Sequence, residues 1–159
     1  MSDKNHKIQI FNGQKVRTAW NADEEKWYFS IVDVVAVLTD SADPKQYIKK
    51  MKMRDPELKN NWGTICTLVE LVSSDGKKHK EMTADQKGMF RIIQSIPSPK
   101  AEPFKQWMAQ VASDRLDQMQ DPELNFQQAF EDYRRLGYSE RWVNQRLQGI
   151  KARKELTDE

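Results

Sequence analysis

The side chains of this sequence best suited to chemistry with a partner are positively charged, and they fall in two groups. The first group combines five cations with one amide: Lys45, Gln46, Lys49, Lys50, Lys52 and Arg54. Cations contact nucleic-acid phosphates, whereas Gln46 and Arg54 are the members best able to reach base edges. The second group, Lys77, Lys78 and Lys80, could add backbone contacts. The competing interpretation of the first group is a solvated helix surface on which lysines provide solubility. For the second group it is an edge hairpin on which lysines prevent aggregation.

The acids Asp33, Asp40 and Asp43 lie close together in the sequence, as the ligands of a metal-dependent nuclease can. Two of them are explained as helix caps, and no His or Glu follows at ligand spacing. There is also no glycine-rich loop that could cradle phosphates. We therefore predict no catalytic residue, no metal site and no cofactor, and expect that the chain is not an enzyme.

The remaining candidates are explained more simply by packing. Lysines flank His79 and would repel a metal ion, and Cys66 is expected to be a small buried hydrophobic residue. A single cysteine excludes an internal disulfide. Five aromatic residues could stack on single-stranded bases, but their spacing favours core packing. They are Trp20, Trp27, Phe29, Phe104 and Trp107.

The first group of cations is expected to be carried by the second helix of a short helical pair. Ser30 is a good N-cap for residues 31–38, and Asp33 completes a weak form of the capping box. That segment is apolar nearly all round and therefore predicts a buried helix, with a buried strand as the alternative.

For the second helix, Asp43 is the predicted cap and Pro44 fits its first turn. On a helical wheel, one sector that should face the core holds Tyr47, Ile48 and Met51. Lys45, Lys49 and Lys52 fall opposite, and Gln46, Lys50 and Arg54 form the neighbouring stripe.

The rest of the sequence predicts strands, then helices. Residues 7–29 alternate as β structure, with a hairpin signal at Asn12-Gly13, and 55–63 is expected to be a loop. Residues 67–72 and 78–82 flank a turn at 73–76. A capping box of Thr83 and Gln86 is expected to open a helix. Further helices are expected from about residue 102 to Asp121-Pro122 and, as a final αα-hairpin, on either side of 136–139.

Composition limits the partners. The chain has 159 residues, a hydrophobic fraction of 38% and a net charge of only +2, so any nucleic-acid surface must be a local patch. The amino-terminal segment lacks an apolar signal core, and no segment is long enough to span a membrane, so we expect no membrane contact and a cytoplasmic location.

Several stretches in this order resemble the amino-terminal domain of the BRO family. That domain occurs in prophage antirepressors, in large DNA viruses and in bacterial proteins similar to DNA-damage-inducible protein D. The matching stretches are Val16–Trp20, Trp27–Leu38, Met89–Ser95 and Ala101–Met108. The sequence departs from the family where Leu38-Thr39-Asp40 replaces the usual Leu-Gly-Tyr. The tail from Tyr133 to Trp142 resembles an extension of the bacterial branch, in which the chain continues past this point.

The resemblance implies an α+β fold of small antiparallel hairpins packed with short helices, followed by a helical hairpin. The predicted organisation is a disordered segment at 1–6, a DNA-binding domain at 7–120 and a helical extension at 121–159, truncated from a longer chain.

Three functions compete at this stage. The first is a regulator of phage or stress genes that binds duplex DNA. The second is an antirepressor or adaptor that binds a repressor protein, with Tyr138 and Trp142 as anchors. The third is a nuclease. The sequence leaves the oligomeric state open, including a homodimer.

Overall fold

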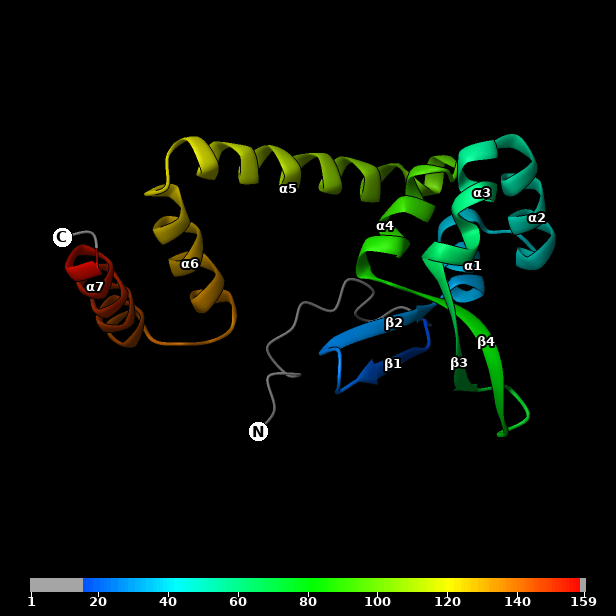
Figure 1. Ribbon diagram of the computed structural model, residues 1–159, viewed down its shortest axis with the longest axis horizontal. Coiled ribbons are helices and arrows are strands. Elements are labelled where there is room, and N and C mark those ends of the chain that lie inside the picture. The colour runs from blue at the N-terminus through cyan, green and yellow to red at the C-terminus, as the bar shows by residue number, and fades with distance from the viewer. Residues whose placement is uncertain (1–15, 158–159) are drawn as a thin grey trace. The chain divides into compact units, whose positions relative to one another are not determined.

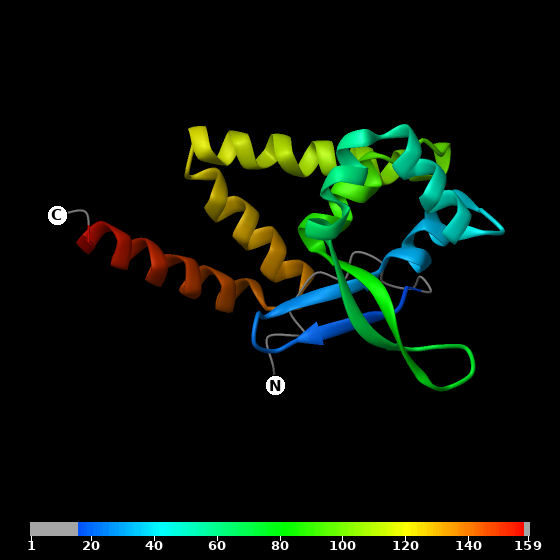
Figure 2. The same cartoon turned by 45° about the vertical axis from the view of Figure 1, so that its right-hand side comes forward.

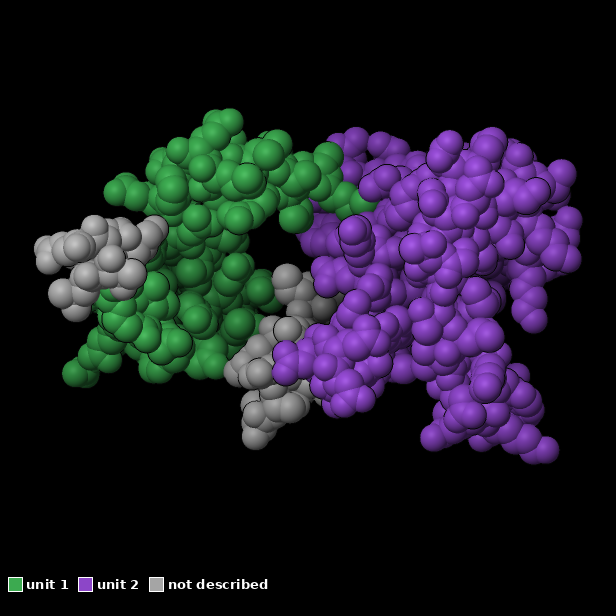
Figure 3. All heavy atoms as spheres, in the orientation of Figure 1, with its two compact units in different colours: residues 1–8, 108–159 green, residues 9–107 purple. Residues whose placement is uncertain are grey.

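The chain divides into two compact units, drawn in different colours in Figure 3. The computed structural model describes residues 16–157, without the side chains of 151 and 154–157. Of these residues, 16–107 belong to unit 2 and 108–157 to unit 1. The predictions for residues 1–6, for strands at Ile8 and Ile10 and for a turn at Asn12-Gly13 lie outside the described residues.

Unit 2 is built on a four-stranded antiparallel sheet with the order β1-β2-β4-β3 (Figure 1). Its strands are β1 (Thr18–Asn21), β2 (Lys26–Ser30), β3 (Cys66–Val72) and β4 (Lys78–Asp85). The long β3–β4 hairpin joins the short β1–β2 hairpin where Ser30 lies opposite Thr83. The prediction of an α+β fold with antiparallel hairpins is confirmed.

The helices of unit 2 are α1 (Ile31–Thr39), α2 (Pro44–Arg54), α3 (Pro56–Ile65) and α4 (Gln86–Gln94), followed by a 3-10 turn, η2 (Pro99–Ala101). Figures 1 and 2 show α2, α3 and α4 gathered at the end of the unit away from the β3–β4 turn. The core includes four buried residues of α1, namely Ile31, Val34, Val35 and Leu38, and the buried Met89, Ile92 and Ile93 of α4. The run at 31–38 is therefore a buried helix, as predicted, and not a strand.

The first two helices begin as their sequences predict. The Ser30 hydroxyl accepts a hydrogen bond from the Asp33 N–H at 3.3 Å, and the Asp43 carboxylate accepts one from the Gln46 N–H at 3.2 Å. Asp33 does not complete a capping box, because its carboxylate is bound to Arg17. Asp40 ends α1 at a φ of 56°, in the left-handed region that glycine adopts most readily. Aspartate tolerates this conformation, so the turn into α2 forms without Gly.

The prediction of a loop at 55–63 is wrong, because α3 occupies this segment. Asp55 ends α2 and also caps α3, with its carboxylate accepting a hydrogen bond from the Leu58 N–H at 3.1 Å. Pro56 occupies the first turn, and the fully buried Leu58 anchors the helix. The Asp-Pro pair that begins α2 is thus repeated at the start of α3.

The predicted capping box of Thr83 and Gln86 is also wrong. Thr83 lies inside β4, where its hydroxyl donates to the Thr67 carbonyl at 2.8 Å. The helix instead begins after Asp85, whose carboxylate accepts from the Gly88 N–H at 2.9 Å. Pairing with β2 extends β4 past Met82, which moves the start of the helix.

Helix α5 (Glu102–Gln120) begins in unit 2 and ends in unit 1, where α6 (Leu124–Arg135) and α7 (Glu140–Thr157) follow. The αα-hairpin of α6 and α7 is confirmed: Gly137 takes a φ of +97°, and the Ser139 hydroxyl caps α7 by accepting from the Trp142 N–H. The rings of Tyr138 and Trp142 stack with centroids 4.2 Å apart, and Tyr133 meets both edge-on. The domain boundary after residue 120 stays a prediction. None of the helices within 16–157 has the length and apolarity that a membrane span requires.

Gly88 marks a close approach of α4 to the end of α3. A Cβ at this position would lie 2.9 Å from the Ile65 Cγ2 atom and 3.0 Å from the Ile65 carbonyl oxygen. We expect Gly88→Ala to destabilise the protein by about 1–3 kcal/mol, despite the higher helix propensity of alanine. Gly63→Ala, where a Cβ meets no atom within 4 Å, is the matched control and should gain up to about 1 kcal/mol. Urea unfolding of both variants tests this, and equal effects would contradict it.

Candidate nucleic-acid interface

Helix α2 turns one side to the core and exposes the other. Ile48 and Met51 are buried and Tyr47 is half-buried, as the wheel predicts. Five of the predicted DNA-binding residues are exposed on the remaining surface: Lys45, Gln46, Lys49, Lys50 and Arg54. The sequence from Pro44 to Arg54 contains no acidic residue, so no carboxylate of α2 itself neutralises these cations.

Lys52, the sixth predicted residue of this helix, differs from the others. It is half-buried, and its ammonium nitrogen lies 4.7 Å from the centroid of the Trp62 ring on α3. Such a cation–π contact stabilises the packing of the two helices. The expectation that Lys52 points straight outward is therefore wrong, because the sequence prediction had no helix at 56–65 to supply Trp62.

Helix α3 also adds exposed polar residues beside α2 that the sequence prediction missed. Lys59, Asn60 and Asn61 are exposed, and they share the helix with the exposed Glu57. The signal that could have revealed them is Asp55-Pro56, which has the same cap chemistry as Asp43-Pro44.

Asp55 fixes the joint between α2 and α3 to the end of α4. Its carboxylate accepts a hydrogen bond from the Ser95 hydroxyl at 2.7 Å and lies 3.4 Å from the Arg91 guanidinium. The pKa of Asp55 is lowered, chiefly by the Ser95 hydrogen bond, then by the Leu58 N–H and Arg91, while desolvation acts in the opposite direction. The joint therefore holds a charged carboxylate at neutral pH, which orients both helices.

The second cation group lies on the β3–β4 hairpin, as predicted. The turn is closed by Ser73 N–H donating to the Lys77 carbonyl at 2.8 Å, and Gly76 adopts a φ of +80°. Asp75 accepts from the Lys77 N–H and lies 3.1 Å from the His79 ring nitrogen. His79 therefore contributes to the turn.

Lys77, Lys78 and Lys80 are all exposed. Lys78 and Lys80 point to the same face of the hairpin, because alternate strand residues do. Across the ladder they face Val72 and Glu70, respectively. The Glu70 carboxylate offsets part of the charge of Lys80, so this group is the weaker of the two in net positive charge.

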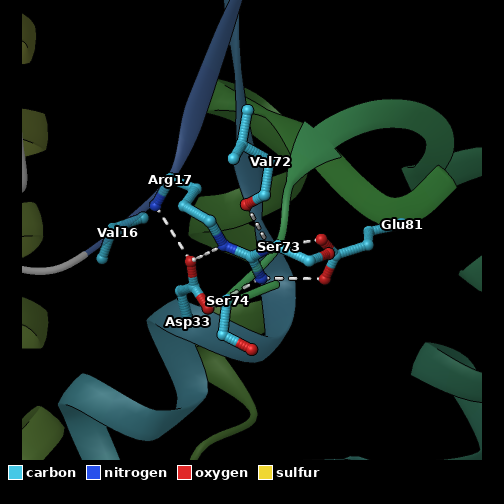
Figure 4. A pocket seen from close by; sticks show the side chains of 7 residues that line it. All are labelled: Val16, Arg17, Asp33, Val72, Ser73, Ser74 and Glu81. Carbon is cyan, nitrogen blue, oxygen red and sulfur yellow. Dashed lines mark hydrogen bonds and ion pairs between the residues drawn. The ribbon is translucent and has the colours of Figure 1, made fainter. Parts of the chain in front are cut away.

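Arg17 links the turn end of β3, and β4, to α1, as Figure 4 shows. Its guanidinium donates to Asp33 on α1 at 2.7 and 3.1 Å and to Glu81 on β4 at 2.8 Å. A further hydrogen bond of 3.1 Å reaches the carbonyl of Val72 at the end of β3. These residues line an open hollow together with Val16, Ser73 and Ser74.

The two carboxylates raise the pKa of Arg17, with the Asp33 hydrogen bond as the largest cause and that of Glu81 next. The guanidinium thus serves to hold the chain together, and its ion pairs form part of the lining of the hollow. The sequence prediction missed this cluster because its members are 16 and 64 residues apart. A lone arginine at the start of a strand gave no signal of them.

The two segments that carry the cation groups, α2 and the β3–β4 turn, lie apart in unit 2. In Figures 1 and 2 the β3–β4 turn lies well away from α2 in both views. Figure 3 shows the turn as a projection that an indentation separates from the rest of the unit. They are therefore two patches, not one continuous surface.

The three acids considered for a metal site point to different partners. Asp33 binds Arg17, Asp40 pairs with Lys100 of η2, and Asp43 caps α2. Within residues 16–157, no three His, Cys, Asp or Glu side chains gather where they could hold a metal ion.

Most of the other side chains weighed for chemistry contact neighbours in the fold, although Trp107 is 38% exposed. Burial raises the pKa of the Cys66 thiol to about 12, as expected for a buried cysteine. Trp20 contacts Trp27, and Trp107 contacts both Phe90 and Phe104. These contacts agree with the preference for packing over base stacking.

Comparison with known protein families assigns most of this sequence. The BRO family, N-terminal domain, matches residues 15–113. The chain belongs to the BRO family. The match covers unit 2 and the first part of α5, and it includes both cation groups and the Arg17 cluster. No curated protein and no solved structure matches the chain.

Arg17→Ala should lower the free energy of unfolding by about 1–3 kcal/mol. This reflects lost charged hydrogen bonds on a side chain that is one-third exposed. The variant also leaves Asp33 and Glu81 without their shared cation, so adding Glu81→Gln should restore part of the loss. Lys26→Ala, which removes a more exposed ion pair with Asp85, is the control and should cost much less. Urea titrations measure both free energies of unfolding. Equal losses of stability in Arg17→Ala and Lys26→Ala would contradict the proposed role of the Arg17 cluster.

Asp55→Asn should produce a pH-dependent loss of stability. Because folding lowers the pKa of Asp55 below its ordinary 3.8, the stabilisation is present above pH 3.8 and is lost as the pH falls through the folded-state value. Asparagine keeps the capping ability, so the variant reports the charge. We expect the difference in unfolding midpoint from wild type to shrink at acid pH, and to be smaller throughout in a Ser95→Ala background. A difference that does not change with pH would disprove the assignment.

Proposed function

We propose that the protein is a DNA-binding regulator of the antirepressor type, and that unit 2 binds duplex DNA through α2. The observation that carries the proposal is the acid-free exposed surface of α2, with Lys45, Lys49, Lys50 and Arg54. Membership of the BRO family supports the same class of function. The proposal describes a binding protein, not an enzyme.

The build of α2 suits this role. A helix that contacts a groove must be held firmly, and α2 is capped by Asp43, anchored by Ile48 and Met51 and tied at its end through Asp55. Its lysines would contact phosphates, which position the protein, and Gln46 and Arg54 would lie nearest the base edges.

The β3–β4 turn would supply a separate backbone contact. Lys77, Lys78 and Lys80 are exposed, and the turn lies apart from α2 in the same unit. A duplex would therefore span two patches. Since Glu70 faces Lys80, the contribution of the turn should be smaller than that of α2.

The test is a charge reversal on α2 that avoids the packed Lys52. Lys49→Glu with Lys50→Glu should weaken binding to random-sequence duplexes of about two helical turns by at least tenfold. It should also reduce the salt dependence by about two units of slope, since two phosphate contacts are lost. Fluorescence anisotropy between about 50 and 200 mM salt measures both quantities.

The matched control carries the same charge change elsewhere. Lys87→Glu with Arg115→Glu alters two exposed cations outside the proposed surface and should leave the salt slope nearly unchanged. Equal losses in the two double variants would mean that only net charge matters. If the wild-type protein shows no salt-dependent binding to duplex DNA, a repressor protein is favoured as the partner.

A further inference from the structure

Helix α7 has a charge pattern that the proposed function does not use. Its sequence from Arg141 to Arg153 contains four cations and no acidic residue. Between the cations lie three amide side chains, Asn144, Gln145 and Gln148. This stretch lies beyond the part of the chain that matches the BRO family domain.

The amides gather on one side of the helix. Val143 is buried, and Leu147 and Ile150 are half-buried, so they define the packed side of α7. Arg141, Asn144, Gln145 and Gln148 follow at spacings of three, four and seven residues, which places them on a common stripe. All four are exposed.

This stripe fits a nucleic acid better than it fits a protein surface. It contains no large apolar side chain, which a docking helix needs to bury. Amides and guanidinium groups, by contrast, offer the donor and acceptor pairs that recognise adenine and guanine in the major groove. Arg146, exposed beside the stripe, is placed to contact phosphate.

Gly149 points to close approach by a partner. It lies inside the helix, where glycine is unfavourable, yet a Cβ added there would meet no atom within 4 Å. No neighbour within the described residues therefore explains why this position has a glycine. Together with the exposed Ala152 it leaves a low strip along the amide stripe, which lets the floor of a groove come near the helix.

The start of α7 is also held firmly. Ser139 caps the helix, and the rings of Tyr133, Tyr138 and Trp142 join it to α6. Trp142 and Tyr138, predicted as anchors for a repressor, thus have a packing role within the hairpin. A rigid helix of this length can enter a major groove.

We infer that α7 is a second DNA-contacting helix, which places Arg141, Asn144, Gln145 and Gln148 against base edges in the major groove. The partner is duplex DNA, and the site is independent of α2. The chain would then contact DNA through both of its compact units.

The sharpest test uses Gly149. Gly149→Leu in the full chain fills the low strip while improving helix propensity, so the variant should melt no lower than wild type. We expect its affinity for random-sequence duplex DNA to fall roughly tenfold, in line with the loss of one good base contact. Gln127→Leu, on the exposed surface of α6, is the control and should bind as wild type does. Wild-type affinity of Gly149→Leu would overturn the inference.

A second variant tests base reading without adding bulk. Gln145→Ala with Gln148→Ala should keep the salt slope but lose sequence preference when duplexes are selected from a random pool. An unchanged preference would overturn the inference. Repeating both measurements with Lys49→Glu and Lys50→Glu present separates the two sites. If α2 does not bind DNA, these two substitutions alone leave the affinity unchanged while the effects of the α7 variants remain at full size.

Discussion

One guanidinium group joins the sheet of unit 2 to its first helix. Arg17 precedes β1, yet it binds Asp33 on α1, Glu81 on β4 and the carbonyl at the end of β3. Three separate segments thus converge on a single planar donor, which a lysine could not replace because it lacks the fork geometry. Because α1 leads directly into α2, and β3 and β4 carry the projecting turn, the same ion pairs set the direction of both cationic patches.

The second constraint is the short path between helices. Helix α1 ends at Asp40 in a left-handed conformation and α2 begins at Pro44, so few residues separate the buried helix from the exposed one. Lys100 pairs with Asp40 and thereby ties this turn to η2. The positions of the α2 lysines therefore depend on packing that is remote from them in sequence.

Local signals in the sequence predicted much of this fold. Ser30, Asp43 and Ser139 cap the helices they were expected to cap, because a cap needs only a side-chain oxygen and an N–H two or three residues away. Predictions failed where a distant partner decided the outcome. Thr83 stays in β4 because β2 pairs with it, and Asp33 is taken by Arg17.

The candidate site divides in the same way. Burial of Ile48 and Met51 followed from helical spacing, and so did exposure of most of the α2 lysines. Lys52 could not be placed, because its partner Trp62 lay in a segment assigned as a loop. That assignment overlooked the helix-start signal at Asp55-Pro56. The signal is followed by only three large apolar residues, Leu58, Trp62 and Ile65. The distance between α2 and the β3–β4 turn depends on the whole sheet, so no local pattern could supply it.

The double use of Asp55 has a consequence for length variation in this part of the chain. One residue both ends α2 and begins α3, so there is no spare linker in which to absorb an insertion or deletion. Adding a single residue would rotate α3 by roughly 100° about its axis, since a helix turns once in about 3.6 residues. Leu58 would then leave the core and Trp62 would leave Lys52. The number of residues from Pro44 to Ile65 is therefore constrained more tightly than the identity of the exposed residues in this segment.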